Sequence, residues 1–254
     1  MDLPVNTFKR GLNANPPMIG TWTMSTSPVM AEAMGCCGYD FIVIDMEHTP
    51  NDVPQTLALL QAVAGTPSAS LVRIPWNDPV IVKRLLDCGA QSLMFPFIES
   101  VEEAEAAVRS TRYPPHGIRG AAAMHRAARY GGVSDYFSKA ASEICVTLQI
   151  ETINALGKLP EIAAVDGVDC IFIGPGDLSA SMGLIGQVGH EKVQAALASA
   201  ASACRKAGKP CGVLATDPAM ARRLLEAGFS WVSVSSDLAM ATSKARSNLA
   251  EIRA

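Results

Sequence analysis

The chain has 254 residues and a formal net charge of −3, and 49% of its residues are hydrophobic, 18% charged and 6% aromatic. The charge density is too low for a coiled coil, and the apolar content is too high for a disordered chain. The mildly acidic balance without a basic block argues against nucleic-acid and anionic-membrane partners. The charge-free run 11–31 is interrupted by Pro16, Pro17 and Pro28, so it does not predict a membrane-spanning helix. The apolar surplus therefore predicts a large buried interior.

The seven cysteines are scattered without a Cys-x-x-Cys spacing, which argues against a zinc ribbon and a thioredoxin motif. Cys145, Cys170 and Cys211 open apolar runs and are expected to be small buried side chains. Residues 1–10 lack the apolar core of a signal peptide. Together these features favour a reducing, cytoplasmic location.

In chain order, short apolar runs rich in β-branched residues predict eight strands, over residues 18–23, 41–45, 70–74, 92–96, 145–151, 170–174, 211–215 and 231–235. Most are continuous apolar runs, which is typical of parallel strands that are covered on both faces. Helix signals separate most of them. Ser100 and Glu103 form a capping box, and Asp78 and Asp217 each precede a proline in the first turn of a helix.

Eight strands that alternate with helices in about 250 residues predict one (β/α)8 TIM barrel over residues 1–254. A doubly wound open sheet is the alternative, but no Gly-rich dinucleotide fingerprint follows the first strand. The connection between the fourth and fifth strands is unusually long. Its stretch around 113–140 is rich in Gly, Arg and Ala, and an excursion of this length is usually a functional or intersubunit loop.

Polar side chains at strand ends are the candidate site residues, because catalytic groups of TIM barrels gather at the carboxyl ends of the strands. Gln149 and Glu151 share one face of their strand, and on the interior face Glu151 is a buried carboxylate that needs a cation. Asp177, just after the next strand, offers a second carboxylate for an open octahedral Mg²⁺ or Mn²⁺ site. Alternatively, Glu151 pairs with Arg73, and Asp177 caps the following turn.

A histidine and an arginine stand at the ends of two other strands. His48 follows Asp45 by three residues, so Asp45 can accept a hydrogen bond from one ring nitrogen and leave the other for proton transfer. Alternatively, Asp45 or Thr49 caps the helix that begins near 51–52, and His48 is merely exposed. Arg73 beside a metal is suited to hold a carboxylate or a developing enolate.

The lysines fall in helices or at their ends, so none is placed to form a Schiff base at a strand end. No Gly-x-Ser-x-Gly nucleophile motif is present either. The sequence therefore favours enolate chemistry stabilised by a metal over an imine aldolase.

Six segments resemble, in order, the motifs of the HpcH/HpaI metal-dependent aldolases: IDMEHTPND (44–52), VRIPWND (72–78), TRYPP (111–115), GIRG (117–120), QIET (149–152) and IGPGDLS (173–179). The resemblance implies a class II lyase that reversibly cleaves 4-hydroxy-2-oxo acids to pyruvate and an aldehyde through a metal-bound pyruvate enolate. Substrates of this kind include 4-hydroxy-2-oxoheptanedioate and 2-dehydro-3-deoxy sugar acids, from aromatic or sugar acid catabolism.

The resemblance assigns the metal, which is Mg²⁺, Mn²⁺ or Co²⁺, to Glu151 and Asp177, and it implies that Gln149 supports these ligands from outside the coordination sphere. The backbone at Gly176 and Asp177 is implied to hold the pyruvate carboxylate. Members of the family often have alanine at the position of Gly176, so a looser pocket is expected here.

The resemblance also implies roles at the other strand ends. Arg73 steadies the enolate oxygen, and the pair of His48 and Asp45 handles the proton of the C4 hydroxyl. Leu214 lines the pocket near the pyruvate methyl group. The segment 124–126 differs from some members, which leaves the aldehyde specificity open.

The family further implies a homohexamer, a trimer of dimers in which the last helix, about 239–254, is exchanged between subunits. One alternative function is that of a C–C lyase of the citrate-lyase β type acting on a CoA thioester, with Arg126 and Arg129 as candidate phosphate contacts. A non-catalytic barrel scaffold is a further alternative, but an inert barrel has no need of paired carboxylates and an arginine at its strand ends.

Overall fold

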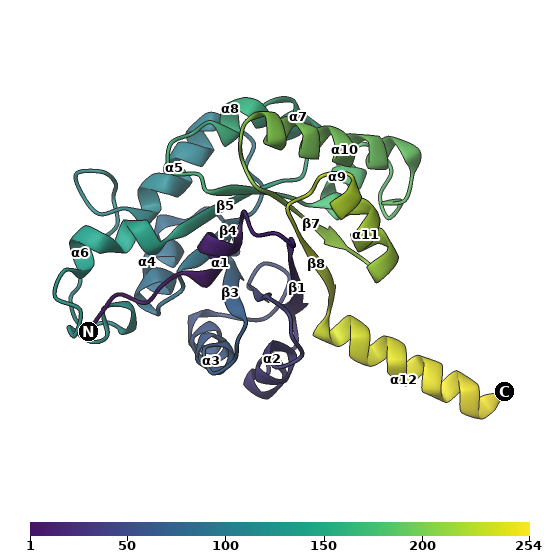
Figure 1. Cartoon of the computed structure of the whole chain (residues 1–254), viewed down its shortest axis with the longest axis horizontal. Helices are drawn as coiled ribbons and strands as arrows, with labels where there is room; N and C mark the ends of the chain where they lie inside the picture. The colour runs from purple at the N-terminus through teal and green to yellow at the C-terminus, as the bar shows by residue number, and fades with distance from the viewer.

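Eight parallel strands close into a barrel in the computed structural model, which describes residues 1–254 (Figure 1). The strands are β1 (Met18–Thr23), β2 (Phe41–Asp45), β3 (Ala69–Arg73), β4 (Ser92–Phe95), β5 (Cys145–Ile150), β6 (Cys170–Ile173), β7 (Cys211–Ala215) and β8 (Trp231–Ser236). Each strand pairs with the next, and β8 pairs with β1. The predicted TIM barrel is confirmed and the open sheet is wrong. Each strand ends within one residue of its prediction.

The helices surround the barrel, as Figure 1 shows. They are α1 (Thr7–Gly11), α2 (Pro28–Gly35), α3 (Val53–Val63), α4 (Pro79–Asp87), α5 (Val101–Thr111), η1 (Arg126–Ala128), α6 (Tyr136–Lys139), η2 (Ala140–Glu143), α7 (Ile153–Gly157), α8 (Leu159–Ala163), α9 (Pro175–Ser181), α10 (Glu191–Lys206), α11 (Pro218–Glu226) and α12 (Asp237–Arg253). The predicted caps are confirmed, since Asp78, Ser100 and Asp217 each accept a backbone N–H in the first turn that follows. The reciprocal half of the capping box is wrong, because the Glu103 carboxylate accepts the Glu99 N–H and not the Ser100 N–H.

The strand residues alternate between two apolar layers, because successive side chains of a strand point to opposite faces. One set packs outward under the helices and forms the larger core cluster. The other set fills the barrel interior, where Phe41, Phe172 and Trp231 pack together, and Phe8 from α1 joins them at the amino end of the barrel. The buried Cys145, Cys170 and Cys211 of the prediction are confirmed.

The inward-facing positions become polar toward the carboxyl end of the barrel. In β2 the inward residues Phe41 and Val43 are followed by Asp45, and all three are completely buried. In β5 the same alternation places Gln149 inside, followed by Glu151 just after the strand. The barrel interior is therefore apolar at one end and carries the candidate site at the other.

The connection from β4 to β5 continues beyond α5 and returns to the far end of α4. Arg119 donates a hydrogen bond to Asp87 Oδ1 at 2.7 Å, and Arg126 donates one to the Cys88 carbonyl oxygen at 2.9 Å. Both acceptors lie at the carboxyl terminus of α4, next to the start of β4. Within one chain, this part of the excursion therefore lies at the amino end of the barrel.

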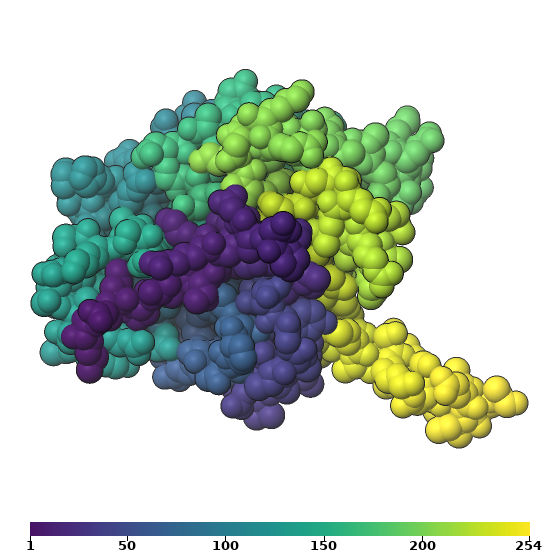
Figure 2. Space-filling view, viewed as in Figure 1, coloured from purple at the N-terminus to yellow at the C-terminus, as the bar shows by residue number.

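The last helix, α12, extends away from the barrel without a covering element (Figures 1 and 2). Its apolar residues Leu238, Leu249 and Ile252 are exposed. An exchange of this helix between subunits stays a prediction. No helix in the structure is both long enough and apolar enough to cross a membrane.

Phe8 fills the amino end of the barrel interior, and we expect the stability of the protein to depend strongly on it. It is completely buried, with its ring 5.2 Å from Phe41 and 5.3 Å from Trp231 in edge-to-face contacts. We expect Phe8→Ala to lower the free energy of unfolding by about 3–5 kcal/mol, measured by urea denaturation, because it leaves a cavity among aromatic rings. Val29→Ala, at a position that is 76% exposed, serves as the control and should change it little. Equal effects of the two substitutions would contradict this account of the interior.

Candidate active site

A buried ion pair joins the ends of β2 and β3. Asp45 and Arg73 are register partners, so their inward side chains lie side by side. Arg73 donates from Nε and Nη2 to the two carboxylate oxygens of Asp45, both at 2.8 Å. The guanidinium also lies over the Trp22 ring, 4.4 Å from its centroid. Arg73 is therefore held rigidly at the carboxyl end of the barrel.

The predicted hydrogen bond between Asp45 and His48 is wrong. Both carboxylate oxygens of Asp45 are engaged by Arg73, because the strand register places these two side chains together inside the barrel. The His48 side chain is instead 56% exposed, and its Nε2 lies 3.9 Å from Glu47 Oε2. The structure thus places His48 at the mouth of the site without the partner that the sequence suggested.

The alternative prediction, that Asp45 or Thr49 caps helix α3, is also wrong. The cap is Asp52, whose side chain accepts a hydrogen bond from the Gln55 N–H. Thr49 instead donates its hydroxyl hydrogen to the Asp45 carbonyl oxygen at 2.5 Å.

Glu151 is a carboxylate inside the barrel with no cationic partner in the chain. It is 1% exposed and accepts hydrogen bonds from the Gln149 side-chain amide and from the Phe97 N–H, the latter at 2.8 Å. Its pKa is raised to about 7, and burial is the largest cause. The two hydrogen bonds lower the pKa, and the charges of Glu47 and Asp177 raise it. The alternative pairing of Glu151 with Arg73 is wrong, because Arg73 pairs with Asp45 and Glu47.

Glu47 is a functional candidate that the sequence reasoning missed. Its Oε2 lies 3.0 Å from Arg73 Nη1, yet this buried atom accepts no hydrogen bond. The pKa of Glu47 is raised to about 7, and burial is the largest cause. The positive charge of Arg73 lowers this pKa, and the negative charges of Asp45 and Asp177 raise it. Its position in the sequence could have identified it. Glu47 follows Asp45 by two residues, and side chains two residues apart in extended backbone point to the same side.

The remaining predicted residues lie in the segment after β6, which begins helix α9, and in β7. Gly174 approaches Glu151 so closely that a Cβ atom on it would lie 2.5 Å from Glu151 Oε2. Asp177 follows in the first turn of α9, and its charge acts on both Glu47 and Glu151. A Cβ atom on Gly176 would meet nothing within 4 Å, which leaves open space there. Leu214 of β7 is partly buried against the interior apolar cluster.

These side chains fit a divalent cation. The charges of Glu47 and Asp177 act on Glu151, and Glu47 Oε2 and Gln149 Oε1 are buried without a hydrogen-bond donor. No group of three or more His, Cys, Asp or Glu side chains is arranged so that it could hold a metal ion by itself. The donor set is therefore that of an open site with hard oxygen ligands, in which water and substrate complete the coordination of a cation such as Mg²⁺ or Mn²⁺.

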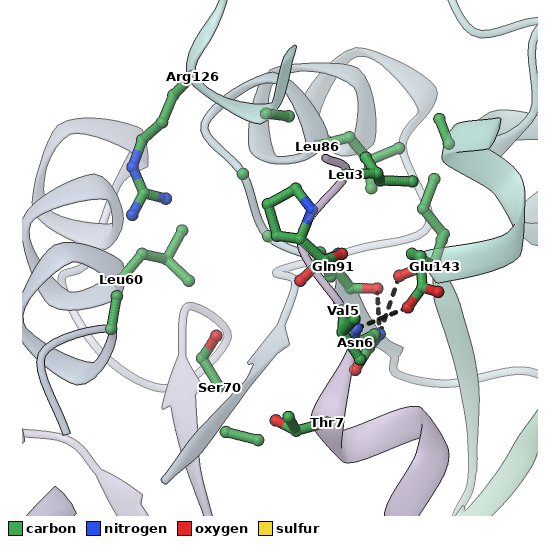
Figure 3. A pocket seen from close by; sticks show the side chains of 18 of the residues that line it. Leu3, Val5, Asn6, Thr7, Leu60, Ser70, Leu86, Gln91, Arg126 and Glu143 are labelled. Atoms are coloured by element: carbon green, nitrogen blue, oxygen red, sulfur yellow. Dashed lines mark hydrogen bonds between the residues drawn. The ribbon is translucent and has the colours of Figure 1, made fainter. Parts of the chain in front are cut away.

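A cavity of about 340 Å³ lies at the other end of the barrel (Figure 3). It is lined by residues at the amino ends of β3, β4 and β5 together with the N-terminal segment and the excursion, including Ser70, Gln91, Arg126 and Arg129. None of the predicted site residues lines it. The two arginines therefore lie away from the candidate site of their own chain.

Comparison with known proteins gives consistent matches over nearly the whole chain. The model of the family described as HpcH/HpaI aldolase/citrate lyase matches residues 18–243. A protein of Sagittula stellata named hydroxypyruvate/pyruvate aldolase is 45% identical over 251 residues, which cover 99% of both chains. A Klebsiella pneumoniae 4-hydroxy-2-oxo-heptane-1,7-dioate aldolase is 49% identical over 233 residues, or 91% of this chain and 88% of that protein. The crystal structure of a HpcH/HpaI aldolase/citrate lyase family protein from Burkholderia cenocepacia superposes with a TM-score of 0.94 at 41% identity, covering 98% of this chain and 100% of that one.

The raised pKa of Glu151 predicts a pH dependence of stability in the presence of a chelator. A carboxyl with a higher pKa in the folded than in the unfolded chain binds more protons when folded. Its contribution to the free energy of unfolding is therefore lost as the pH rises from 4.5 through 7. Between pH 5 and 8, we expect wild type to lose about 2.5 kcal/mol relative to Glu151→Gln, measured by urea denaturation in EDTA. Parallel stability curves of the two proteins would contradict the burial of an unpaired carboxylate.

Proposed function

Since the chain belongs to the HpcH/HpaI aldolase/citrate lyase family, we propose that it is a carbon–carbon lyase that reversibly cleaves 4-hydroxy-2-oxo acids to pyruvate and an aldehyde. The observation that carries this proposal is the group of buried, unpaired carboxylates beside a rigid arginine at the carboxyl end of the barrel. Such a site can hold a cation and stabilise a developing enolate.

The bond that breaks joins C3 and C4 of the substrate. Its electron pair stays on the pyruvate fragment as an enolate, while the C4 hydroxyl loses its proton and becomes the aldehyde carbonyl. A proton delivered to C3 then gives pyruvate. A divalent metal held by Glu151 and Asp177, with Gln149 supporting Glu151, supplies Lewis acidity to the 2-oxo group in this reaction.

Arg73 stabilises the negative charge that develops on the enolate oxygen. Its position is set before substrate arrives, because Asp45 holds two of its nitrogens and Trp22 lies under its plane. Preorganised charge of this kind lowers the barrier without reorganisation during the reaction. Asp45 thus acts by orienting Arg73.

The first turn of α9 and β7 bind the pyruvate fragment. The N–H groups of Gly176 and Asp177, in the first turn of α9, face the substrate carboxylate, since first-turn N–H groups have no acceptor within the helix. Leu214 borders the methyl end from β7. The open space beside Gly176 leaves this end of the site roomy.

His48 takes the proton of the C4 hydroxyl, directly or through one water molecule. Its exposure at the mouth supports this role, because the imidazole can reach the part of the substrate that leaves as aldehyde.

The assembly proposed for this enzyme is a homohexamer, a trimer of dimers in which α12 packs on a neighbouring subunit. The uncovered apolar residues of α12 support this arrangement. The seven free cysteines support a reducing compartment, the cytoplasm.

A lyase acting on a CoA thioester is the second candidate, but its supporting residues are poorly placed. Arg126 and Arg129 line the cavity at the amino end of the barrel, so neither presents a cation to CoA phosphates at the mouth of its own site. A non-catalytic scaffold is disfavoured because buried, unpaired carboxylates are costly to maintain without a function.

Removal of divalent metal should abolish activity. We expect EDTA to stop pyruvate release from a 4-hydroxy-2-oxo acid, and Mn²⁺, Co²⁺ or Mg²⁺ to restore it. Glu151→Ala and Asp177→Ala should each lose Mn²⁺ binding by calorimetry, because each removes one of two protein ligands. Full activity in EDTA, with borohydride trapping of pyruvate on a lysine, would overturn the metal mechanism.

Substitution of His48 should separate two partial reactions. We expect His48→Ala to slow cleavage by about 10²–10⁴-fold. Exchange of the pyruvate methyl protons with deuterated water, followed by NMR, should persist, because it involves no C4 hydroxyl. Equal loss of both reactions would show that His48 acts elsewhere.

A further inference from the structure

The carboxylate of Glu151 is oriented by hydrogen bonds from two elements. Gln149 of β5 donates its side-chain amide to Oε2, and the Phe97 N–H, in the loop after β4, donates to Oε1 at 2.8 Å. A carboxylate has about four acceptor positions, so these two donors leave both oxygens able to bind a cation. The donors therefore determine how Glu151 presents its oxygens, and the orientation of a ligand contributes to metal affinity.

The Phe97 N–H points at Glu151 only because of an unusual backbone conformation. Phe97 is left-handed, with φ of 51°, and a non-glycine residue keeps this conformation only where its surroundings hold it. Its ring centroid lies 6.1 Å from that of Trp76, but Trp76 is itself 59% exposed and offers little restraint. The next residue, Ile98, donates its N–H to the Gln149 carbonyl oxygen at 3.2 Å. The loop after β4 is therefore held mainly by polar contacts to β5 and the chain that follows it.

Glu99 supplies the side-chain part of this restraint. Its carboxylate accepts hydrogen bonds from the Thr152 hydroxyl at 2.6 Å and from the Asn154 side-chain amide at 3.0 Å. Thr152 directly follows Glu151 and is also the N-cap of α7. Hydrogen bonds to an ionised acceptor are stronger than neutral ones, and the bond from Thr152 is partly buried. Glu99 therefore ties the loop after β4 to the start of α7, on either side of the metal ligand.

The backbone of Glu99 is anchored as well. Its N–H donates to Glu103 Oε2 at 2.6 Å, and its carbonyl oxygen accepts from the Lys158 ammonium at 3.2 Å. Every contact in this network joins residues of the same chain. The carboxylate of Glu99 is thus presented to Thr152 and Asn154 from a fixed position.

From this network we propose that Glu99 is a positioning residue for the metal ligand Glu151. By bracing the loop after β4, it keeps the Phe97 N–H on the Glu151 carboxylate and thereby raises the affinity of the site for its divalent cation. The inference rests on the proposed aldolase function, which assigns the cation to Glu151 and Asp177. It adds a residue that acts on the metal site through the loop and not as a ligand.

Metal affinity can be measured without turnover by titrating the metal-free protein with Mn²⁺ and following the EPR signal of free Mn²⁺. We expect Glu99→Ala to raise the Kd for Mn²⁺ by about tenfold, as is typical when the support of a metal ligand is removed. Cleavage of a 4-hydroxy-2-oxo acid should then need more Mn²⁺ for half-maximal rate and recover at saturating Mn²⁺, because both ligands are still present. An unchanged Kd would overturn the proposal.

A second variant separates positioning from long-range attraction of the cation. Glu99→Gln removes the negative charge but keeps a side-chain carbonyl oxygen for the Thr152 hydroxyl, so most of the affinity should be retained. Glu105→Ala is the matched control, since it removes the same charge from an exposed position on α5, and it should leave the Kd unchanged. Equal losses in Glu99→Ala and Glu99→Gln would show that charge alone acts and would contradict the positioning role.

Asn154→Ala tests the same link from its other end and decides the matter if Glu99→Ala does not fold. It removes one donor to Glu99 at an exposed position, and we expect the Kd for Mn²⁺ to rise about threefold. The double variant with Glu99→Ala should bind Mn²⁺ no more weakly than Glu99→Ala alone, because both substitutions break one contact. Unchanged binding in Asn154→Ala, or fully additive losses, would count against the network.

The outcomes distinguish this inference from the proposed function. If wild type binds no Mn²⁺, or if Glu151→Ala binds it as tightly as wild type, the metal assignment is wrong and the positioning role with it. If wild type binds Mn²⁺ and Glu151→Ala does not, but Glu99→Ala keeps the wild-type Kd, only the positioning role is wrong.

Discussion

The bidentate pair of Asp45 and Arg73 is the interaction on which the site depends. Breaking a buried pair by removing one partner typically costs about 3–5 kcal/mol, because the remaining charge stays uncompensated. Here the pair is completed by the stacking of Arg73 on Trp22, itself held by a hydrogen bond to Ser233. Four consecutive strands of the barrel, β8, β1, β2 and β3, thereby determine where one guanidinium lies.

The same pairing explains why the other carboxylates remain uncompensated. Because Arg73 is committed to Asp45 and Glu47, Glu151 faces Asp177 and Glu47 with no cation of its own. Desolvation and like charge together raise the pKa values of Glu47 and Glu151, which is an unstable arrangement for an empty barrel. It is a suitable arrangement for a barrel that binds a divalent ion and an anionic intermediate.

The two ends of the barrel differ in charge as well as in polarity. The carboxyl end is acidic, with one basic strand residue and an exposed tryptophan. The amino end is closed by the ring of Phe8 and receives the arginines of the long excursion. This segregation follows from the connectivity of the fold, since the excursion docks on the end of α4 and not on the loops after the strands.

Local pattern alone determined the eight strands, the capping residues and the shared face of Gln149 and Glu151, because periodicity and turn chemistry act over a few residues. It also placed Arg73 and Asp45 at strand ends. Only the tertiary structure decided that Asp45 binds Arg73 and not His48, since strand register is set by the closure of the whole barrel. The role of Phe97 was equally beyond local pattern, because a backbone N–H acquires its acceptor only when distant loops meet.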